Sequence, residues 1–270
     1  LAAPPAVRDA LGGYYESAAT LGRRTAELHL ALASGSDPAF APERMTRADW
    51  RRLAGAMKRQ ARRALRTLAR RATDLPPEAR DLARRVQLAS RRILDRFDRL
   101  EGFGADGARI RIHGDYHLGQ VLWAEDDFYI VDFEGEPARP LEERRHKQSP
   151  LKDIAGMLRS YGYAAHVGLL VAAGQRPDDR ARLEPWARVW ATWSASAFLR
   201  SYLDTAGGAM FLPSEPAAAR ALLDAFALEK ACYELEYELN NRPDWVEIPL
   251  AGLLALSGPG GPFRGGEALR

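Results

Sequence analysis

Three polar side chains suited to proton transfer and metal binding lie close together in the segment 109–137. Asp115 is in a short polar loop, Gln120 follows five residues later, and Asp132 comes directly after an apolar run. Carboxylate and amide oxygens are ligands that Mg²⁺ accepts, and a carboxylate can also take the proton of an attacking hydroxyl. These residue types predict a phosphoryl-transfer site, with Asp115 as the base and with Gln120 and Asp132 holding Mg²⁺.

The elements expected around this loop would bring the three side chains together. Residues 109–112 alternate arginine and isoleucine, which predicts a half-buried strand that leads into the loop. Residues 121–123 and 128–131 are apolar and predict a hairpin across an acidic turn, and 128–131 is apolar enough to predict a buried strand. Such a hairpin would return Asp132 to the neighbourhood of Asp115.

The order of residues around this loop matches the pattern of kinase active sites. Protein kinases place His-Arg-Asp in the catalytic loop, an Asn five residues after the Asp, and a later Asp-Phe-Gly. Here HGD occupies 113–115, Gln120 takes the amide position, and DFE occupies 132–134. In this pattern His113 would brace the catalytic loop and Glu134 would support the site. A purely structural hairpin with its acids in turns is the alternative, but it has no need for this full set at this spacing.

Three longer segments extend the match: HGDYHLGQVLW, IVDFEGEPARPLEERRHKQSPLKDIAGMLRSYGYAA and YELEYELNNRPDW. Together they resemble the bacterial maltokinases of the aminoglycoside-phosphotransferase and protein-kinase-like superfamily, over about residues 10–257. The resemblance implies an α+β, mostly helical fold, the C-terminal lobe of the kinase. It also implies transfer from ATP with Mg²⁺ to the anomeric hydroxyl of maltose, in the cytoplasm. A trehalose synthase partner or fusion and a role in glycogen biosynthesis follow from the same resemblance.

One face of a later predicted helix mixes an amine, a carboxylate and two phenols. Lys230, Tyr233, Glu234 and Tyr237 follow the spacing i, i+3, i+4 and i+7. Sugar hydroxyls need both donors and acceptors, and aromatic faces can stack on sugar rings. Periodicity alone favours core tyrosines beside a surface Lys–Glu pair. The resemblance to the maltokinase sugar site favours substrate binding.

Two further residues have roles that the sequence leaves open. Asp153 lies in the first turn of a helix predicted from Pro150. In kinase-like folds an Asp here often bonds the catalytic-loop backbone, but a first-turn acid also suits the helix dipole. Arg144 lies in a loop at 138–149, where it would hold phosphate or sugar or would simply be a solvated cation.

The chain order predicts one kinase-like lobe at 1–257. Its expected parts are a linker, a first helix, a helical hairpin opened by a capping box at Thr46 and Asp49, a catalytic hairpin, a helical sugar-binding part and a flexible tail. The respective ranges are 1–10, 11–32, 45–100, 109–137, 150–257 and 258–270.

Composition narrows the class of protein. The 270 residues are 46% hydrophobic with a net charge of +3, a globular composition with no run long enough for a transmembrane helix. The lone Cys232 excludes an internal disulfide and fits the reducing cytoplasm, and no signal peptide is visible. The arginine-rich segment 47–71 has no interleaved aromatic residues, which favours a solvated helix face over a nucleic-acid surface. We therefore expect neither a nucleic-acid partner nor a membrane partner.

The sequence before Arg109 contains no Gly-rich loop and no strand lysine to hold the nucleotide phosphates. We therefore expect the N-terminal kinase lobe to be absent from this chain and the chain alone to be inactive. Two alternatives remain open: a related kinase with a different small alcohol as acceptor, and a non-catalytic module that docks trehalose synthase or glucan.

Overall fold

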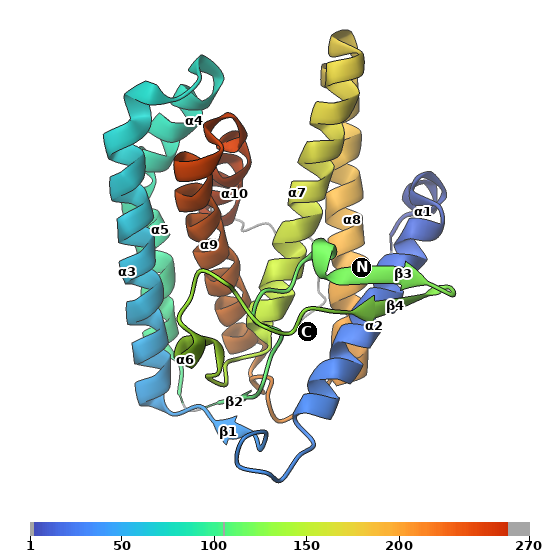
Figure 1. Ribbon diagram of the computed structural model, residues 1–270, viewed down its shortest axis with the longest axis vertical. Helices are drawn as coiled ribbons and strands as arrows, with labels where there is room; N and C mark the ends of the chain where they lie inside the picture. The colour runs from blue at the N-terminus through green and yellow to red at the C-terminus, as the bar shows by residue number, and fades with distance from the viewer. Residues whose placement is uncertain (1–2, 105, 259–270) are drawn as a thin grey trace. The chain divides into compact units, whose positions relative to one another are not determined.

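The computed structural model describes residues 3–104 and 106–258 (Figure 1). The predicted flexible tail therefore lies outside the described residues, apart from Gly258. The contacts divide the chain into two compact units that interleave in sequence, residues 1–43 with 108–212 and residues 44–107 with 213–270. The segment 150–257, predicted as one helical sugar-binding part, is thus shared between the two units. The mostly helical α+β fold is confirmed.

The first unit holds the catalytic segment. Its helices are α1 (Pro5–Leu11), α2 (Gly13–Leu32), α6 (Leu141–Arg144), α7 (Leu151–Gln175) and α8 (Arg180–Ala206), and its strands are β2 (Ala108–Arg109), β3 (Val121–Ala124) and β4 (Asp127–Ile130). Helix α8 packs along both α2 and α7. A Cβ at Gly22 of α2 would lie 2.1 Å from the Phe198 carbonyl oxygen of α8, so only glycine permits this close approach.

The second unit is helical. It contains α3 (Arg47–Arg71), α4 (Pro77–Leu88), α5 (Ser90–Asp98), α9 (Pro216–Asn241) and α10 (Glu247–Ser257), and the two-residue β1 (Glu43–Arg44) lies at the boundary between the units in the sequence. The capping box at the start of α3 is confirmed, because Thr46 and Asp49 each bond the other's backbone N–H. Trp50 and Leu68 of α3 are completely buried in the core of this unit.

Three local predictions are wrong. The linker at 1–10 contains α1, because Pro5 occupies a first-turn position where its missing N–H costs nothing. The second helix of the predicted hairpin is interrupted at Ala89 and forms α4 and α5, with the Ser90 hydroxyl bonded to the Gln87 carbonyl oxygen. The strand predicted at 109–112 is reduced to β2 and a single bridge between Ile110 and Gln148. In the described part of the chain, no strand of more than two residues runs beside it.

The predicted catalytic hairpin forms, with Asp127 in β4 and not in the turn, but it lacks the predicted burial. Glu125 and Asp126 make its two-residue turn, both with positive φ, as such tight hairpin turns require. Tyr129 of β4 is 51% exposed and its cross-strand neighbour Leu122 is 57% exposed, so the prediction of a buried strand is wrong. The reason is that this sheet has two strands in the described part of the chain, where α2 is the main helix beside β4.

The helices of the described residues include none that combines the length and the apolar character needed to span a membrane.

Candidate active site

The catalytic loop at 113–117 is held by the first turn of α7. The carboxylate of Asp153 accepts hydrogen bonds from the backbone N–H of His113 at 2.8 Å and of Gly114 at 2.9 Å. Asp153 is 1% exposed, so these bonds form away from water. The contact expected from kinase-like folds is present, and it fixes the backbone immediately before Asp115.

Helix α2 supplies the third hydrogen bond to the same carboxylate. His29 Nε2 lies 3.2 Å from Asp153 Oδ2, and His29 Nδ1 lies 3.0 Å from the Tyr202 hydroxyl of α8. A proton on His29 Nε2 lets the ring donate to Asp153, and Nδ1 faces the Tyr202 hydroxyl. Burial alone would raise the pKa of Asp153, but the hydrogen bonds from His29 and Gly114 outweigh it and hold the pKa below its ordinary value. The buried carboxylate therefore stays ionised.

The His113 ring joins the catalytic loop to the end of the hairpin. Its Nδ1 accepts from the Asp115 backbone N–H at 3.4 Å, and its Nε2 donates to the Val131 carbonyl oxygen at 2.8 Å. This geometry requires the Nε2-protonated tautomer. His113 is 1% exposed. It thus occupies the bracing position expected from the sequence.

The far side of the loop is held by α2 and α7 together. The hydroxyl groups of Tyr116 and Thr25 lie 2.7 Å apart, and the burial of Tyr116 raises its pKa. A Cβ at Gly156 of α7 would lie 2.5 Å from the Tyr116 carbonyl oxygen, so the loop backbone rests directly on the helix. One helical turn further along α7, the Ser160 hydroxyl accepts a hydrogen bond from the Leu118 N–H at 3.0 Å. The loop is therefore fixed on both sides of Asp115.

Asp115 itself lies beside His117, which was not among the predicted site residues. His117 Nε2 lies 3.8 Å from Asp115 Oδ2, and His117 Nδ1 accepts from the Gly119 N–H at 3.0 Å. The Asp115 side chain is 15% exposed, so it is largely but not completely shielded from solvent. The sequence signal for His117 was its position two residues after Asp115 in the same polar loop.

Gln120 and Asp132 meet as expected from the hairpin. Gln120 Nε2 donates to Asp132 Oδ2 at 2.9 Å. Asp132 has a φ of 66°, a left-handed conformation that costs energy for a residue other than glycine and that recurs at functional sites. Within the described residues no group of three or more His, Cys, Asp and Glu side chains could hold a metal ion. One carboxylate and one amide oxygen still fit Mg²⁺, which commonly takes few protein ligands and completes its shell with phosphates and water.

The residues after the hairpin are engaged with one another. Arg144 Nη1 lies 3.2 Å from the Glu134 carbonyl oxygen and 3.7 Å from its carboxylate. Gly135, the residue after Glu134, has a φ of 76° and approaches both Arg144 and Gly114. Arg144 therefore supports the segment that follows Asp132. A contact with phosphate or sugar remains a prediction.

The predicted sugar-binding face lies on α9, which belongs to the second unit. The Lys230 ammonium is 5.1 Å from the centre of the Tyr233 ring, and the Arg242 guanidinium is 5.3 Å from that of Tyr237. Tyr237 is 44% exposed, whereas Glu234 is nearly buried. The amine, carboxylate and phenols share one helix face, and their role in binding sugar remains a prediction.

Part of the arginine-rich face of α3 serves packing inside the second unit. Arg63 Nε lies 2.9 Å from each of the two carboxylate oxygens of Glu236 on α9, and Lys58 pairs with Asp98. Arg71 bonds the Leu239 carbonyl oxygen near the end of α9. Part of this basic face therefore stabilises the packing of helices within the second unit.

Comparison with known proteins places this geometry in a family. The model of the phosphotransferase enzyme family matches residues 7–186, which include α2, the catalytic loop, the hairpin and α7. The chain belongs to this family. The kinase-like superfamily expected from the sequence is thereby confirmed, and the maltokinase assignment within it is not supported.

The curated relatives are sugar kinases. A glucosamine kinase of Streptacidiphilus jiangxiensis is 29% identical over 233 residues, 86% of this chain and 47% of the relative. A glucosamine kinase of Mycolicibacterium smegmatis (strain ATCC 700084 / mc(2)155) is 33% identical over 144 residues, 53% of this chain and 33% of the relative.

Solved structures give the same result. A glucosamine kinase in complex with glucosamine, ADP and inorganic phosphate has a TM-score of 0.71 and 26% identity, covering 90% of this chain and 51% of that one. A second crystal structure of a glucosamine kinase has a TM-score of 0.68. The chain therefore spans about half the length of these proteins.

Proposed function

We propose that this chain is the catalytic-base and metal-binding part of an ATP-dependent sugar kinase. The observation that carries the proposal is the immobilised loop that presents Asp115 on the same hairpin-linked segment as Gln120 and Asp132. Asp115 would orient the acceptor hydroxyl and take its proton. Gln120 and Asp132 would hold Mg²⁺, which neutralises charge on the phosphates of ATP.

Glucosamine is the first acceptor to test, because the relatives in both comparisons are named glucosamine kinases. Maltose is the second, on the sequence resemblance. The predicted sugar face offers a way to separate them. Glucosamine carries an amine that is attracted by a carboxylate such as Glu234, whereas maltose is uncharged and needs only hydrogen bonds and ring stacking. Glu234→Gln should therefore weaken glucosamine binding more than maltose binding, as measured by calorimetry.

The kinase proposal is tested with the full-length gene product in a coupled ADP-release assay over a panel of sugars. Asp115→Asn should lower kcat by about 10²–10⁴-fold with little change in the KM for ATP, since the carboxylate acts on the proton of the acceptor. Near-wild-type turnover of that variant would refute the assigned base. Preference for an aminoglycoside or choline over both sugars would refute the acceptor class.

The chain itself should bind an acceptor sugar without turning it over. It carries the proposed base and sugar face, but its sequence offers no Gly-rich loop or strand lysine before the catalytic loop to hold the β- and γ-phosphates. Calorimetry should show sugar binding without tight ATP binding. Tight ATP binding by the chain alone would contradict this division of labour.

A further inference from the structure

The catalytic hairpin has few contacts to hold it. It consists of two four-residue strands, and two-stranded hairpins are marginally stable by themselves. Leu122 and Tyr129, which face each other across the strands, are both more than half exposed, so burial contributes little to its position. Yet Gln120 and Asp132 flank the two strands at the open end, opposite the turn, and their geometry depends on where the hairpin rests.

The base of the hairpin is fixed by the catalytic loop. The Val131 carbonyl oxygen accepts from His113, the Val131 N–H donates to the Gln120 carbonyl oxygen at 3.0 Å, and the Gln120 N–H donates to the His117 carbonyl oxygen at 2.9 Å. All these bonds lie at one end. They act as a pivot and leave the direction of the strands to be set elsewhere.

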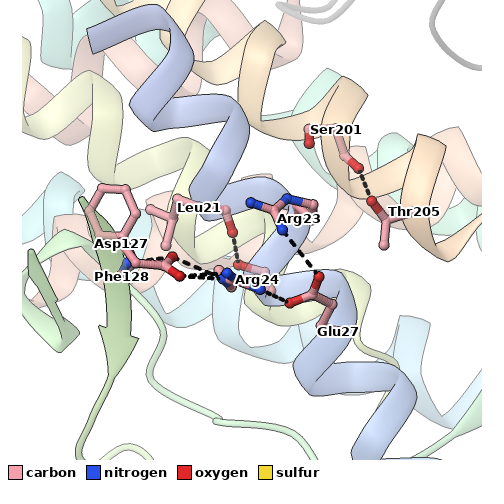
Figure 2. A network of polar contacts seen from close by, with 9 residues as sticks. Leu21, Arg23, Arg24, Glu27, Asp127, Phe128, Ser201 and Thr205 are labelled. Carbon is pink, nitrogen blue, oxygen red and sulfur yellow. Dashed lines mark hydrogen bonds and ion pairs between the residues drawn. The ribbon is translucent and has the colours of Figure 1, made fainter. Parts of the chain in front are cut away.

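Helix α2 bonds the other end through the Arg24 side chain (Figure 2). Arg24 Nε lies 2.9 Å and 3.0 Å from the two carboxylate oxygens of Asp127, and its Nη2 also bonds Asp127. Asp127 is the first residue of β4, directly after the turn. The guanidinium is itself oriented by Glu27, which accepts from Arg24 Nη1 at 2.6 Å. The hydrogen bonds from Arg24 lower the pKa of Asp127 to about 2, so the pair stays charged at any ordinary pH.

We propose that Arg24 is a positioning residue that aims the hairpin through Asp127 and thereby sets the mutual placement of Gln120, Asp132 and Asp115. A planar two-pronged arginine–carboxylate contact defines direction as well as distance, which suits this role. The inference rests on the proposed function only for its catalytic consequence. The structural part concerns the hairpin itself.

The matched control is Arg23, the preceding residue on α2. Arg23 pairs with Glu27 at 3.5 Å, and among the described residues it makes no hydrogen bond or ion pair to the hairpin, although its charge adds a minor attraction for Asp127. Amide hydrogen exchange of the full chain, followed by mass spectrometry, should show about threefold faster exchange over 121–130 in Arg24→Gln and no change there in Arg23→Gln. Exchange in α9 and α10 should stay as in the wild type in both variants. The swap Arg24→Asp with Asp127→Arg should restore slow exchange.

A catalytic readout follows in the full-length gene product. Arg24→Gln should lower kcat and raise the Mg²⁺ concentration for half-maximal rate, with the KM for the sugar unchanged, and Arg24→Lys should recover part of the loss. Unchanged exchange over 121–130, or equal effects of Arg24→Gln and Arg23→Gln, would overturn the positioning role. If no variant and no wild-type protein phosphorylates a sugar, the proposed function fails, and the exchange experiment still decides the role of Arg24.

Discussion

The buried carboxylate of Asp153 provides the sharpest test of how the catalytic loop is held. It accepts three hydrogen bonds, from the backbone of His113 and Gly114 and from His29. Asp153→Asn keeps the shape of the side chain but replaces one oxygen by an NH₂ group. Whichever way the amide is turned, at least one backbone N–H then faces another donor in a site closed to water.

The magnitude follows from counting these groups. If the amide oxygen faces His113 and His29, Gly114 loses its acceptor; if it faces Gly114, His113 loses its acceptor and His29 must change tautomer. Each buried donor left unsatisfied costs about 1–3 kcal/mol, and the mismatch creates two of them, the backbone N–H and the new NH₂ group. Relief from burying a charge offsets part of this cost. We expect Asp153→Asn to lower the free energy of unfolding by about 2–4 kcal/mol.

The assay is urea unfolding at neutral pH, with amide exchange of residues 113–118 measured in parallel. The control is Asp204→Asn, which changes an exposed acid on α8 of the same unit. It should alter the free energy of unfolding by less than about 0.5 kcal/mol. A loss below about 1 kcal/mol for Asp153→Asn, with unchanged exchange in the loop, would refute the view that this carboxylate fixes the loop.

Three further outcomes follow from the same contacts. His29→Leu leaves Asp153 and a tyrosine hydroxyl without their buried partner and should lower the free energy of unfolding in urea by about 2–4 kcal/mol. His29→Gln, which can donate and accept hydrogen bonds, should lower it by less than half as much. Gly156→Ala should lower the free energy of unfolding by about 1–3 kcal/mol, because its Cβ would meet the Tyr116 carbonyl oxygen. Gly162→Ala, with no atom within 4 Å of its Cβ, should raise it by up to about 1 kcal/mol. Equal effects in the two variants would contradict the close approach at Gly156. The pKa of Asp153 is held below its ordinary value of 3.8, so its contribution to stability is present above about pH 4 and is lost as the pH falls further. The wild type should therefore lose more stability than Asp153→Asn between pH 5 and pH 3. Parallel curves of unfolding free energy against pH for the two proteins would contradict this.

The motif-bearing residues could be placed from the sequence because their spacing is local. Two apolar runs on either side of an acidic turn predict the hairpin, so the meeting of Gln120 with Asp132 could be expected, whereas the register and the place of Asp127 in β4 came only from the structure. The burial of the hairpin could not be, because an apolar strand is buried only where another layer covers it. That depends on how many strands and helices assemble around it, which no local pattern encodes.

The long-range supports of the loop were also beyond the sequence. His29 and Thr25 lie on a helix that periodicity describes only as amphipathic, and nothing local marks them as partners of Asp153 and Tyr116. Arg24 was one arginine among many in an arginine-rich chain. Only the fold shows which of these cations meets the hairpin.

Because α2 and the catalytic loop are far apart in the sequence, the intervening segment must form a closed loop before α2 can support the catalytic loop. Helix α2 and the catalytic loop belong to one unit, although the whole segment 44–107 intervenes between them. The entropy cost of closing such a segment grows only with the logarithm of its length, so a large insertion here is tolerable if its base is fastened. Glu43 and Arg109, at the two ends of the insertion, pair at 3.1 Å, and the nearly buried ammonium of Lys147 lies 3.0 Å from Glu43 and bonds the carbonyl oxygen of Ala41 at 2.6 Å. These contacts fasten the base of the insertion within the catalytic unit, which allows residues on α2 to hold a loop that follows them at a distance in the sequence.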